Sequence, residues 1–584
     1  MSARSDEVCG DFPAELPAGV VVFMLQPAPA NIPRTNMTTS TYDQLQQLAA
    51  DFWTWRAANQ PISSDDIPRI ERPDDWVPDW SRDAIARRRA ELADFAKRHQ
   101  DISASSWEVD QQVDYRLIGS AIARVHWELN VTCGQERNPG FYVDQTLGLL
   151  FHSVLQPPPF TEKRSQTIVR HLQSFATTII NAKENLAGKA IKPFAIAALE
   201  KLVAVRSRLT KVGTELGPFL SGVDPSEFNQ SVSDAITALE RYHDWLTAEL
   251  DGMTEETAVG REAYVYFLKQ VALMPFTPEQ LLVMGAHEWE RSVAFETLEQ
   301  TRNGGVPELD LYPDQATQMA REEFWEEAAR RFLEAKNILS VPGWMKHYRN
   351  LPLPPYIEPL SFMGVTDDLT SDHRLDEDGV SYIKQPSPDL DYFSLSIAKD
   401  PRPLIVHEGV PGHYFQMTLS WAHENHLRRR YYDSGANEGI GFYAEEMMLQ
   451  FGFFDDRPKL REIMYNFMRL RALRVEVDVK LATGEFTIDQ AADYLEKIVP
   501  VDRATARQEA VFFASSPGQA ITYQIGKLQI VKFLADARLN QKEQFSLRAF
   551  HDYLWKNGNV PIALLRWEYL GLSDEIEFLG AAAG

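Results

Sequence analysis

Cysteine is nearly absent from this sequence of 584 residues. The two cysteines, Cys9 and Cys133, provide no disulfide framework, and neither has a cysteine or histidine partner at zinc-ligand spacing. We therefore expect both thiols to be inert. This composition favours a reducing compartment, so we expect a cytoplasmic protein.

Positive charge is also in deficit. The chain has 59 lysines and arginines against 83 aspartates and glutamates, which gives a formal net charge of −24. Such a surface repels phosphate backbones and anionic lipid. We therefore expect neither nucleic acid nor a membrane surface as a partner.

Long apolar runs are missing from the first 40 residues. The one apolar run there, residues 19–25, is far shorter than the ~20 residues that span a bilayer. Four acidic residues and only Arg4 precede it, whereas a signal peptide begins with basic residues. We interpret residues 1–40 as an irregular, proline-rich leader, in which 19–25 forms a strand or a docked segment.

Helical periodicity dominates much of the remaining sequence. Apolar residues recur at intervals of three and four over residues 42–55, 107–129 and 231–250. Capping boxes that begin at Thr277 and Thr487 predict helices that end near residues 302 and 498. With an apolar fraction of 44%, the chain has enough material for a large core.

Prolines interrupt the stretch from residue 351 to residue 400. Within it, residues 380–384 and 392–395 have the composition of short strands. The fold class predicted from these patterns is mainly α with a small β-sheet.

The densest group of possible metal ligands is His407, Glu408 and His413. Two imidazoles flanking a carboxylate are typical of a catalytic metal site that activates water. The histidines are six residues apart, whereas the usual zinc-hydrolase helix separates them by four. On a regular helix His407 and His413 would therefore point to different sides.

Pro411 and Gly412, between the two histidines, can interrupt a regular helix. Proline has no N–H to donate to the carbonyl of His407, and glycine adopts unusual backbone dihedrals, so a bulge or break is expected here. A two-residue bulge would return His413 to the side of His407, with Glu408 as the candidate general base. The alternative is a pair of ordinary histidines near a Pro-Gly turn, with a solvated Glu408.

The best candidates for a third ligand lie on a predicted helix over residues 438–446. Glu438 and Glu445 are seven residues apart, so their side chains face the same way. Glu438 could bind the metal while Glu445 orients a histidine ligand. The alternative is an amphipathic helix whose glutamates face water.

Three ordered motifs resemble a known family. The stretch 407–413 is His-Glu-Gly-Val-Pro-Gly-His, the predicted helix follows it, and 517–526 is Pro-Gly-Gln-Ala-Ile-Thr-Tyr-Gln-Ile-Gly. Together with Phe-His-Asp at 550–552, these motifs resemble the group called domain of unknown function 885, regarded as predicted metallopeptidases. The similarity extends from about residue 40 to the C-terminus.

The chain departs from the family pattern in two places. Residues 440–442 are Ile-Gly-Phe, where relatives usually have Trp, Ala and another apolar residue, so the shape of the adjoining pocket cannot be carried over. Residues 479–481 are Val-Lys-Leu, where relatives often have Gly-Leu-His. Any role of that family histidine cannot be carried over either.

The family is similar to gluzincin peptidases, and this resemblance implies a zincin-like fold. It implies His407, His413 and Glu438 as zinc ligands, although cobalt or manganese could bind the same atoms. It also implies Glu408 as the base. Candidates from the C-terminal part for stabilising an oxyanion are Tyr523 and His551, with Gln519 as a helper. Without the resemblance, Tyr523 and His551 are more often core residues.

A predicted helix over residues 458–482 carries Arg469, Arg471 and Arg474. A guanidinium grips a carboxylate with two parallel hydrogen bonds, so one arginine, with Arg474 as our candidate, could bind a substrate carboxylate. The alternative is a set of salt bridges within this acidic chain.

The sequence thus predicts a zincin-like body with an N-terminal helical lobe over residues 41–350, a C-terminal lobe over 351–584 and a deep cleft between them. We expect zinc-dependent hydrolysis of an amide bond in a short peptide or peptide-like metabolite. Two alternatives remain. One is a tailoring hydrolase for a non-peptide amide or ester, and the other is a non-catalytic protein that binds a ligand in the cleft.

Overall fold

The computed structural model describes residues 41–63, 70–367, 372–499 and 501–580. The expected leader over residues 1–40, including its apolar run, lies outside them. The described chain is mainly helical with one small sheet, which confirms the predicted fold class. Within these residues, none of the helices combines the length and the apolar character that crossing a bilayer requires.

In the described part of the chain, eleven α-helices precede the long helix α12. They are α1 (Thr41–Asn59), α2 (Arg82–Gln100), α3 (Val109–His126), α4 (Gly134–Arg137), α5 (Pro139–Val143), α6 (Leu149–Leu155), α7 (Glu162–Leu186), α8 (Lys192–Leu202), α9 (Val205–Leu216), α10 (Pro225–Glu249) and α11 (Arg261–Tyr266).

The remaining α-helices and the three strands follow in this order: α12 (Pro278–Arg302), α13 (Gln315–Ala335), β1 (Tyr348–Pro352), β2 (Thr366–Asp367), β3 (Gly379–Ile383), α14 (Tyr392–Ile397), α15 (Arg402–Leu404), α16 (His413–Trp421), α17 (His426–Arg430), α18 (Ser434–Gln450), α19 (Pro458–Thr483), α20 (Ile488–Ile498), α21 (Arg503–Ser515), α22 (Ile521–Gln541), α23 (Leu547–Lys556), α24 (Ile562–Leu570) and α25 (Asp574–Gly580).

Short π-helical and 3₁₀ segments join these elements. The π-helical ones are η1 (Trp127–Thr132), η2 (Asp144–Gly148), η5 (Phe267–Val271) and η8 (Ile405–Gly409), and the 3₁₀ ones are η3 (Gly217–Phe219), η4 (Leu250–Gly252), η6 (Glu358–Met363), η7 (Asp372–Arg374) and η9 (Lys542–Gln544).

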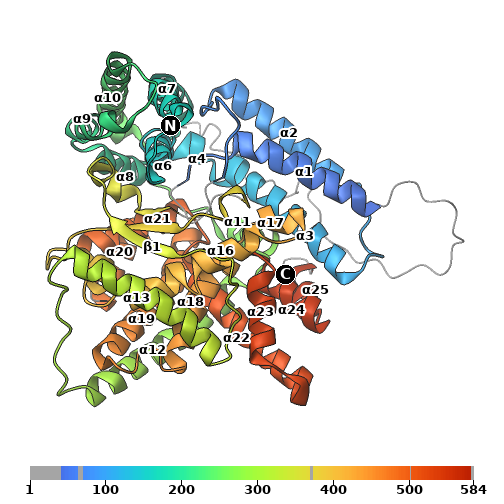
Figure 1. Ribbon diagram of the computed structural model, residues 1–584. Helices are drawn as coiled ribbons and strands as arrows, with labels where there is room; N and C mark the ends of the chain where they lie inside the picture. Colours follow the sequence, from blue (N-terminus) through green and yellow to red (C-terminus); the bar gives the residue numbers. More distant parts are fainter. Residues whose placement is uncertain (1–40, 64–69, 368–371, 500, 581–584) are drawn as a thin grey trace, which may run out of the picture.

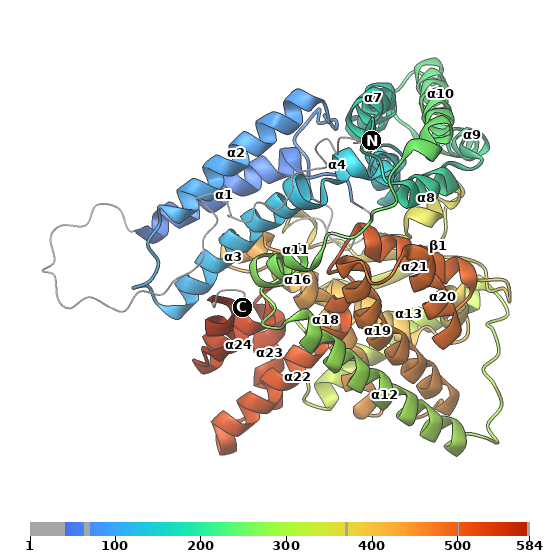
Figure 2. The ribbon, with the colours of Figure 1, turned by 180° about the vertical axis from the view of Figure 1, so that it is seen from behind.

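The helices form two groups with the sheet between them (Figures 1 and 2). In both views α7–α10 lie in the upper group, whereas α12, α13 and α18–α22 lie in the lower one. The boundary predicted at residue 351 falls inside β1, and α12, which precedes that boundary, packs along α19, which follows it. The two helices approach closely because Gly285 of α12 leaves room for Val475 of α19.

The sheet has the strand order β1-β3-β2. β1 runs parallel to β3, with Tyr348 paired to Gly379, and β2 runs antiparallel to β3. The predicted strand at 380–384 is confirmed as β3, but the one at 392–395 is wrong, since this segment is helix α14. Asp391 caps that helix by accepting a hydrogen bond from the backbone N–H of Ser394, and this cap outweighs the strand preference of the aromatic residues.

Several predicted helices are confirmed. α12 and α20 begin directly after complete capping boxes at Thr277 and Thr487. The helices predicted over 438–446 and 458–482 lie within α18 and α19. The caps set the start of α12 and α20 because they satisfy backbone N–H groups that have no partner inside the helix.

Helix α18 lies at the centre of the lower group and is buried along most of its length. The backbones of α18 and α22 are in direct contact. A Cβ atom on Gly526 would lie 2.1 Å from the carbonyl oxygen of Gly435 and 2.7 Å from the Cα of Gly439. This close approach places the start of α22, with Tyr523 one turn before Gly526, beside the residues that α18 presents.

Replacing Gly526 with alanine should therefore destabilise the protein by roughly 3 kcal/mol, because backbone atoms rather than flexible side chains must move. Urea denaturation would measure the change in the free energy of unfolding. Gly305→Ala is the matched control, since Gly305 is exposed and a Cβ there meets nothing within 4 Å. Equal unfolding midpoints for both variants would contradict this account of the helix contact.

Candidate metal centre

The backbone between His407 and His413 is broken as predicted. His407 lies in the π-helical turn η8, Val410 is extended, and α16 begins at His413. The Val410–Pro411 peptide bond is cis. A Cβ on Gly412 would lie 1.7 Å from the carbonyl oxygen of His407, so only glycine fits this reversal.

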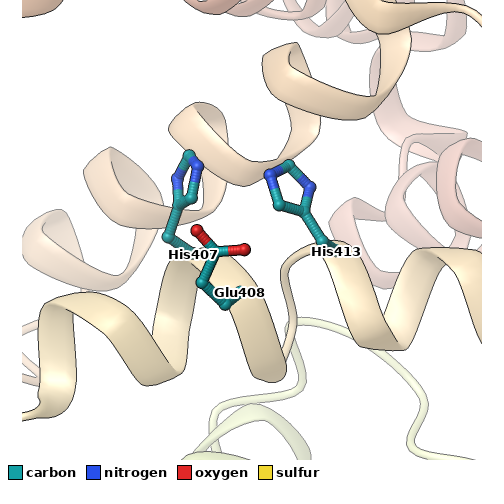
Figure 3. A group of neighbouring side chains, drawn as sticks. All are labelled: His407, Glu408 and His413. Atoms are coloured by element: carbon teal, nitrogen blue, oxygen red, sulfur yellow. The ribbon is translucent and has the colours of Figure 1, made fainter. Parts of the chain in front are cut away.

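The break turns the two imidazoles toward each other (Figure 3). Their ring centroids are 4.6 Å apart. The Nε2 atoms of His407 and His413 lie 3.4 and 3.3 Å from the same carboxylate oxygen, Oε2 of Glu438. The structure therefore brings together the three predicted ligands, and all three are at least nine-tenths buried.

These groups perturb one another electrostatically. Burial alone would raise the pKa of Glu438, but the imidazoles of His413 and His407 outweigh it and hold that pKa well below its usual range. Burial and Arg471 lower the pKa of His407, but Glu438 and Glu445 outweigh them, so the net shift is upward. The carboxylates thus make a buried position where positive charge is favoured.

The donor set fits a zinc ion. Nδ1 of His407 lies 2.7 Å from a carboxylate oxygen of Glu445, which favours the tautomer with hydrogen on Nδ1. The lone pair of Nε2 then faces Oε2 of Glu438, a buried oxygen that makes no hydrogen bond with the described residues. Two lone pairs facing each other call for a cation between them. A tetrahedral zinc site with bonds of 2.0–2.1 Å has ligand–ligand edges of about 3.3–3.4 Å, which match the observed separations.

Glu408 completes the group. It follows His407 directly, is half-buried, and offers a carboxylate oxygen within 4.8 Å of a ring nitrogen of each histidine. In Figure 3 its carboxylate points into the space between the two rings. Glu408 is therefore not the solvated surface side chain of the alternative interpretation.

Gly441 explains one departure from the family pattern. Its backbone lies against both imidazoles, because a Cβ there would be 2.9 Å from Cε1 of His413 and 3.0 Å from Cε1 of His407. The position therefore requires a small residue. Glycine here fills the place that relatives usually give to alanine.

Tyr523 lies beside the histidines. Its ring is nearly parallel to that of His407, with an interplanar angle of 11° and a centroid separation of 6.1 Å. Helix α22 begins at Ile521, four residues after Pro517. The intervening turn is held by the buried carboxylate of Asp478, which accepts hydrogen bonds from the backbone N–H groups of Gly518 and Ala520 at 2.9 and 2.7 Å.

Gln519 links this turn to α18. Its side-chain oxygen accepts a hydrogen bond from the hydroxyl of Ser434 at 3.2 Å, at the first residue of α18. The side chain is buried. The structure therefore assigns Gln519 a contact between elements that carry site residues.

His551 is a core residue in the structure. Its Nδ1 donates to the carbonyl of Ile338, and its Nε2 therefore accepts from the hydroxyl of Tyr443, each at 2.9 Å. Burial lowers the pKa of His551 to about 4, so the ring is neutral at pH 7. Both nitrogens are thus engaged, and this arrangement corresponds to the core alternative rather than to an oxyanion donor.

Arg474 pairs with Glu509 of α21 through two hydrogen bonds. Its guanidinium also lies 4.9 Å from the centre of the Tyr523 ring. This matches the alternative of an internal salt bridge.

Sequence reasoning missed the roles of Asp478 and Arg471. Asp478 holds the turn before α22, and Arg471 pairs with Glu445. The spacing of residues in the sequence does not show which side chains meet from different helices.

A second cluster of possible ligands consists of Glu326, Glu327 and His347. Arg330 occupies it, with its guanidinium 2.7 Å from Glu326 and a hydrogen bond from Nε at 2.8 Å. The arginine already neutralises the one buried carboxylate, so this cluster is a weaker metal candidate.

A cavity of about 910 Å³ lies elsewhere, between α6, α7 and β3. Residues that line it include Trp76, His152, Arg164 and Val380. None of the predicted site residues lines this cavity, so it is separate from the histidine pair.

Comparisons with known proteins agree with the motifs. A family model described as a bacterial protein of unknown function, DUF885, matches residues 66–568. The chain belongs to the DUF885 family. No curated protein matches it.

Solved structures share the fold. One is described as a putative lipoprotein of unknown function from Shewanella oneidensis, with a TM-score of 0.69 and 15% identity over 91% of this chain and 99% of that one. Another is described as a putative lipoprotein from Colwellia psychrerythraea, with a TM-score of 0.68 and 16% identity over 92% and 99% of the two chains. At this identity the likeness shows the fold alone.

Gly441 provides a test of the site geometry. Gly441→Val should weaken zinc binding at least ~10-fold, because a branched side chain would push apart the two imidazoles that it contacts. Competition with a chromogenic chelator would measure the affinity. Gly441→Ala is the control and should weaken binding much less, since the rings need to shift by only a few tenths of an ångström. Tight binding by the valine variant would refute the assigned ligand positions.

Proposed function

We propose that this DUF885 protein is a zinc-dependent hydrolase that cleaves an amide bond in a short peptide or peptide-like metabolite. The observation that carries the proposal is the convergence of His407, His413 and Glu438 around one buried position. A His₂Glu set with an adjacent free carboxylate is a recurring arrangement in zinc hydrolases.

His407, His413 and Glu438 would hold the ion. When bound at such a site, zinc polarises a carbonyl group and lowers the pKa of a water molecule toward 7. Cobalt or manganese suits the same nitrogen and oxygen donors.

Glu408 is the proposed general base and acid. Its carboxylate lies within 4.8 Å of a ring nitrogen of each histidine, and Glu408 is half-buried, so it would reach a water in the site without being fully hydrated. It would accept the proton of the attacking water and then donate it to the leaving amine.

Tyr523 is the proposed oxyanion donor. It is half-buried next to His407, and the guanidinium groups of Arg471 and Arg474 lie 5.7 and 4.9 Å from its ring centre. A phenol hydroxyl can donate a hydrogen bond to the carbonyl oxygen as negative charge develops on it. His551 has both nitrogens engaged, so we assign this role to Tyr523 alone.

The resemblance to gluzincins supports a zincin-like cleft between the two helix groups as the substrate path. A deep cleft walled by helices admits short, flexible substrates and excludes folded proteins. Neither nucleic acid nor a membrane is among the proposed partners, since the net charge is −24. A cytoplasmic location also stays a prediction, because both structural neighbours are described as putative lipoproteins.

One observation favours the alternative of a non-peptide amide or ester as substrate. The guanidinium of Arg474 is engaged by Glu509, so it is not poised to grip the free carboxylate at the end of a peptide. Turnover on matched panels of dipeptides, tripeptides, blocked amides and esters separates the two substrate classes. The remaining alternative, a non-catalytic binding protein, predicts no turnover on any of them.

Metal binding is the first test of the proposal. The purified protein should hold about one zinc ion per chain, measured by elemental analysis. Glu438→Gln should lower the affinity at least ~100-fold, because an anionic ligand is replaced by a neutral amide of the same shape. Glu408→Gln is the control and should retain the ion. Equal zinc content in wild type and Glu438→Gln would remove Glu438 from the ligand set.

Turnover is the second test. Glu408→Gln should reduce kcat by ~10²- to 10⁴-fold on whichever panel substrate the wild type cleaves, because the proton acceptor is lost. Its zinc content should be unchanged. A Glu408→Gln variant as active as wild type would exclude the proposed proton transfer, and a wild type that binds zinc but cleaves nothing would favour the binding protein.

A further inference from the structure

The carboxylate that faces His407 has its own partner. Nη1 of Arg471 donates to Oε2 of Glu445 at 3.0 Å, and Nη2 lies 2.8 Å from Oε1. The same Oε1 atom lies 2.7 Å from Nδ1 of His407. A continuous chain thus runs from Arg471 of α19 through Glu445 of α18 to the imidazole.

Burial makes this chain rigid. Glu445 is 1% exposed and Arg471 is 7% exposed, so water does not compete for these contacts. A guanidinium that meets a carboxylate with both terminal nitrogens fixes its plane as well as its position. The orientation of the Glu445 carboxylate in turn sets the direction of the His407 ring.

Arg471 also contacts the other side of the site. Its guanidinium carbon lies 5.7 Å from the ring centre of Tyr523 and 5.0 Å from that of Phe442. The ring of Tyr523 is nearly parallel to the ring of His407. The buried guanidinium of Arg471 therefore lies beside both Glu445, the partner of the proposed ligand His407, and Tyr523, the proposed oxyanion donor.

We infer that Arg471 is a positioning residue that tunes the affinity of the metal site, acting through Glu445 on His407 and holding Tyr523 in register with it. The inference rests on the proposed metal site. It assigns Arg471 no contact with metal or substrate. Removal of a group that orients a ligand typically costs 10- to 100-fold in metal affinity.

Arg474 provides a matched control one turn further along α19. It is equally buried at 7% exposure, also pairs with a glutamate and also lies over Tyr523. Its partner Glu509 belongs to α21 and is a different carboxylate from Glu445, the one that lies against His407. Loss of Arg474 therefore removes a comparable buried ion pair without touching the chain that leads to His407.

The experiment measures zinc affinity of full-length variants by chelator competition, with circular dichroism and thermal unfolding as checks on folding. Arg471→Met should weaken zinc binding ~10- to 100-fold. The zinc affinity of Arg471→Lys should lie between that of Arg471→Met and that of wild type, because a lysine keeps the charge but cannot bind the carboxylate with two nitrogens. Arg474→Met should bind zinc no more weakly than wild type, because the charge it removes is positive and interacts with Glu438.

A buried Glu445 without its arginine could prevent folding, so the double variant Arg471→Met/Glu445→Gln removes the unpaired charge. It should fold and still bind zinc more weakly than wild type, since a neutral amide replaces the carboxylate beside Nδ1. Wild-type affinity in folded Arg471→Met, or an equal loss in Arg474→Met, would overturn the inference. A wild type that binds no zinc would instead refute the proposed function.

Discussion

The candidate site depends on a buried carboxylate held against two imidazoles. Glu438 is 3% exposed, and its Oε2 atom is within 3.4 Å of two histidine nitrogens. Burying an ionised carboxylate is costly unless a cation or good hydrogen bonds compensate it. The surrounding structure therefore has to hold the Glu438 carboxylate and the imidazoles of His407 and His413 together, away from water. Several features of the local fold serve this purpose.

Glycines provide the close approaches that this arrangement needs. Gly412 permits the reversal after η8, Gly441 leaves room for the two rings, and Gly526 lets α22 reach the backbone of α18. In each case a Cβ atom would clash with a histidine ring of the site or with the backbone that positions the site. The three motifs that are distant in the sequence meet on α18, because η8, α16 and α22 all pack against this helix.

Local signals in the sequence were sufficient for part of this picture. The Pro411-Gly412 pair predicted the break, and the seven-residue spacing of Glu438 and Glu445 predicted their common face. Local signals also failed where a cap opposed residue preference, as at α14. The roles of Arg471, Asp478 and His551 depend on partners from other elements, so no spacing in the sequence could reveal them.

The charge around the site suits the divalent ion that we propose. Glu408, Glu438 and Glu445 contribute three negative charges beside the imidazoles, and Arg471 contributes one positive charge. Arg474 and Glu509 cancel each other. With both imidazoles neutral, as metal ligands must be, two negative charges remain at a position that is largely shielded from water. A monovalent cation would leave one of them uncompensated in a low dielectric, whereas a divalent ion balances both, and imidazole donors select a transition metal over calcium or magnesium.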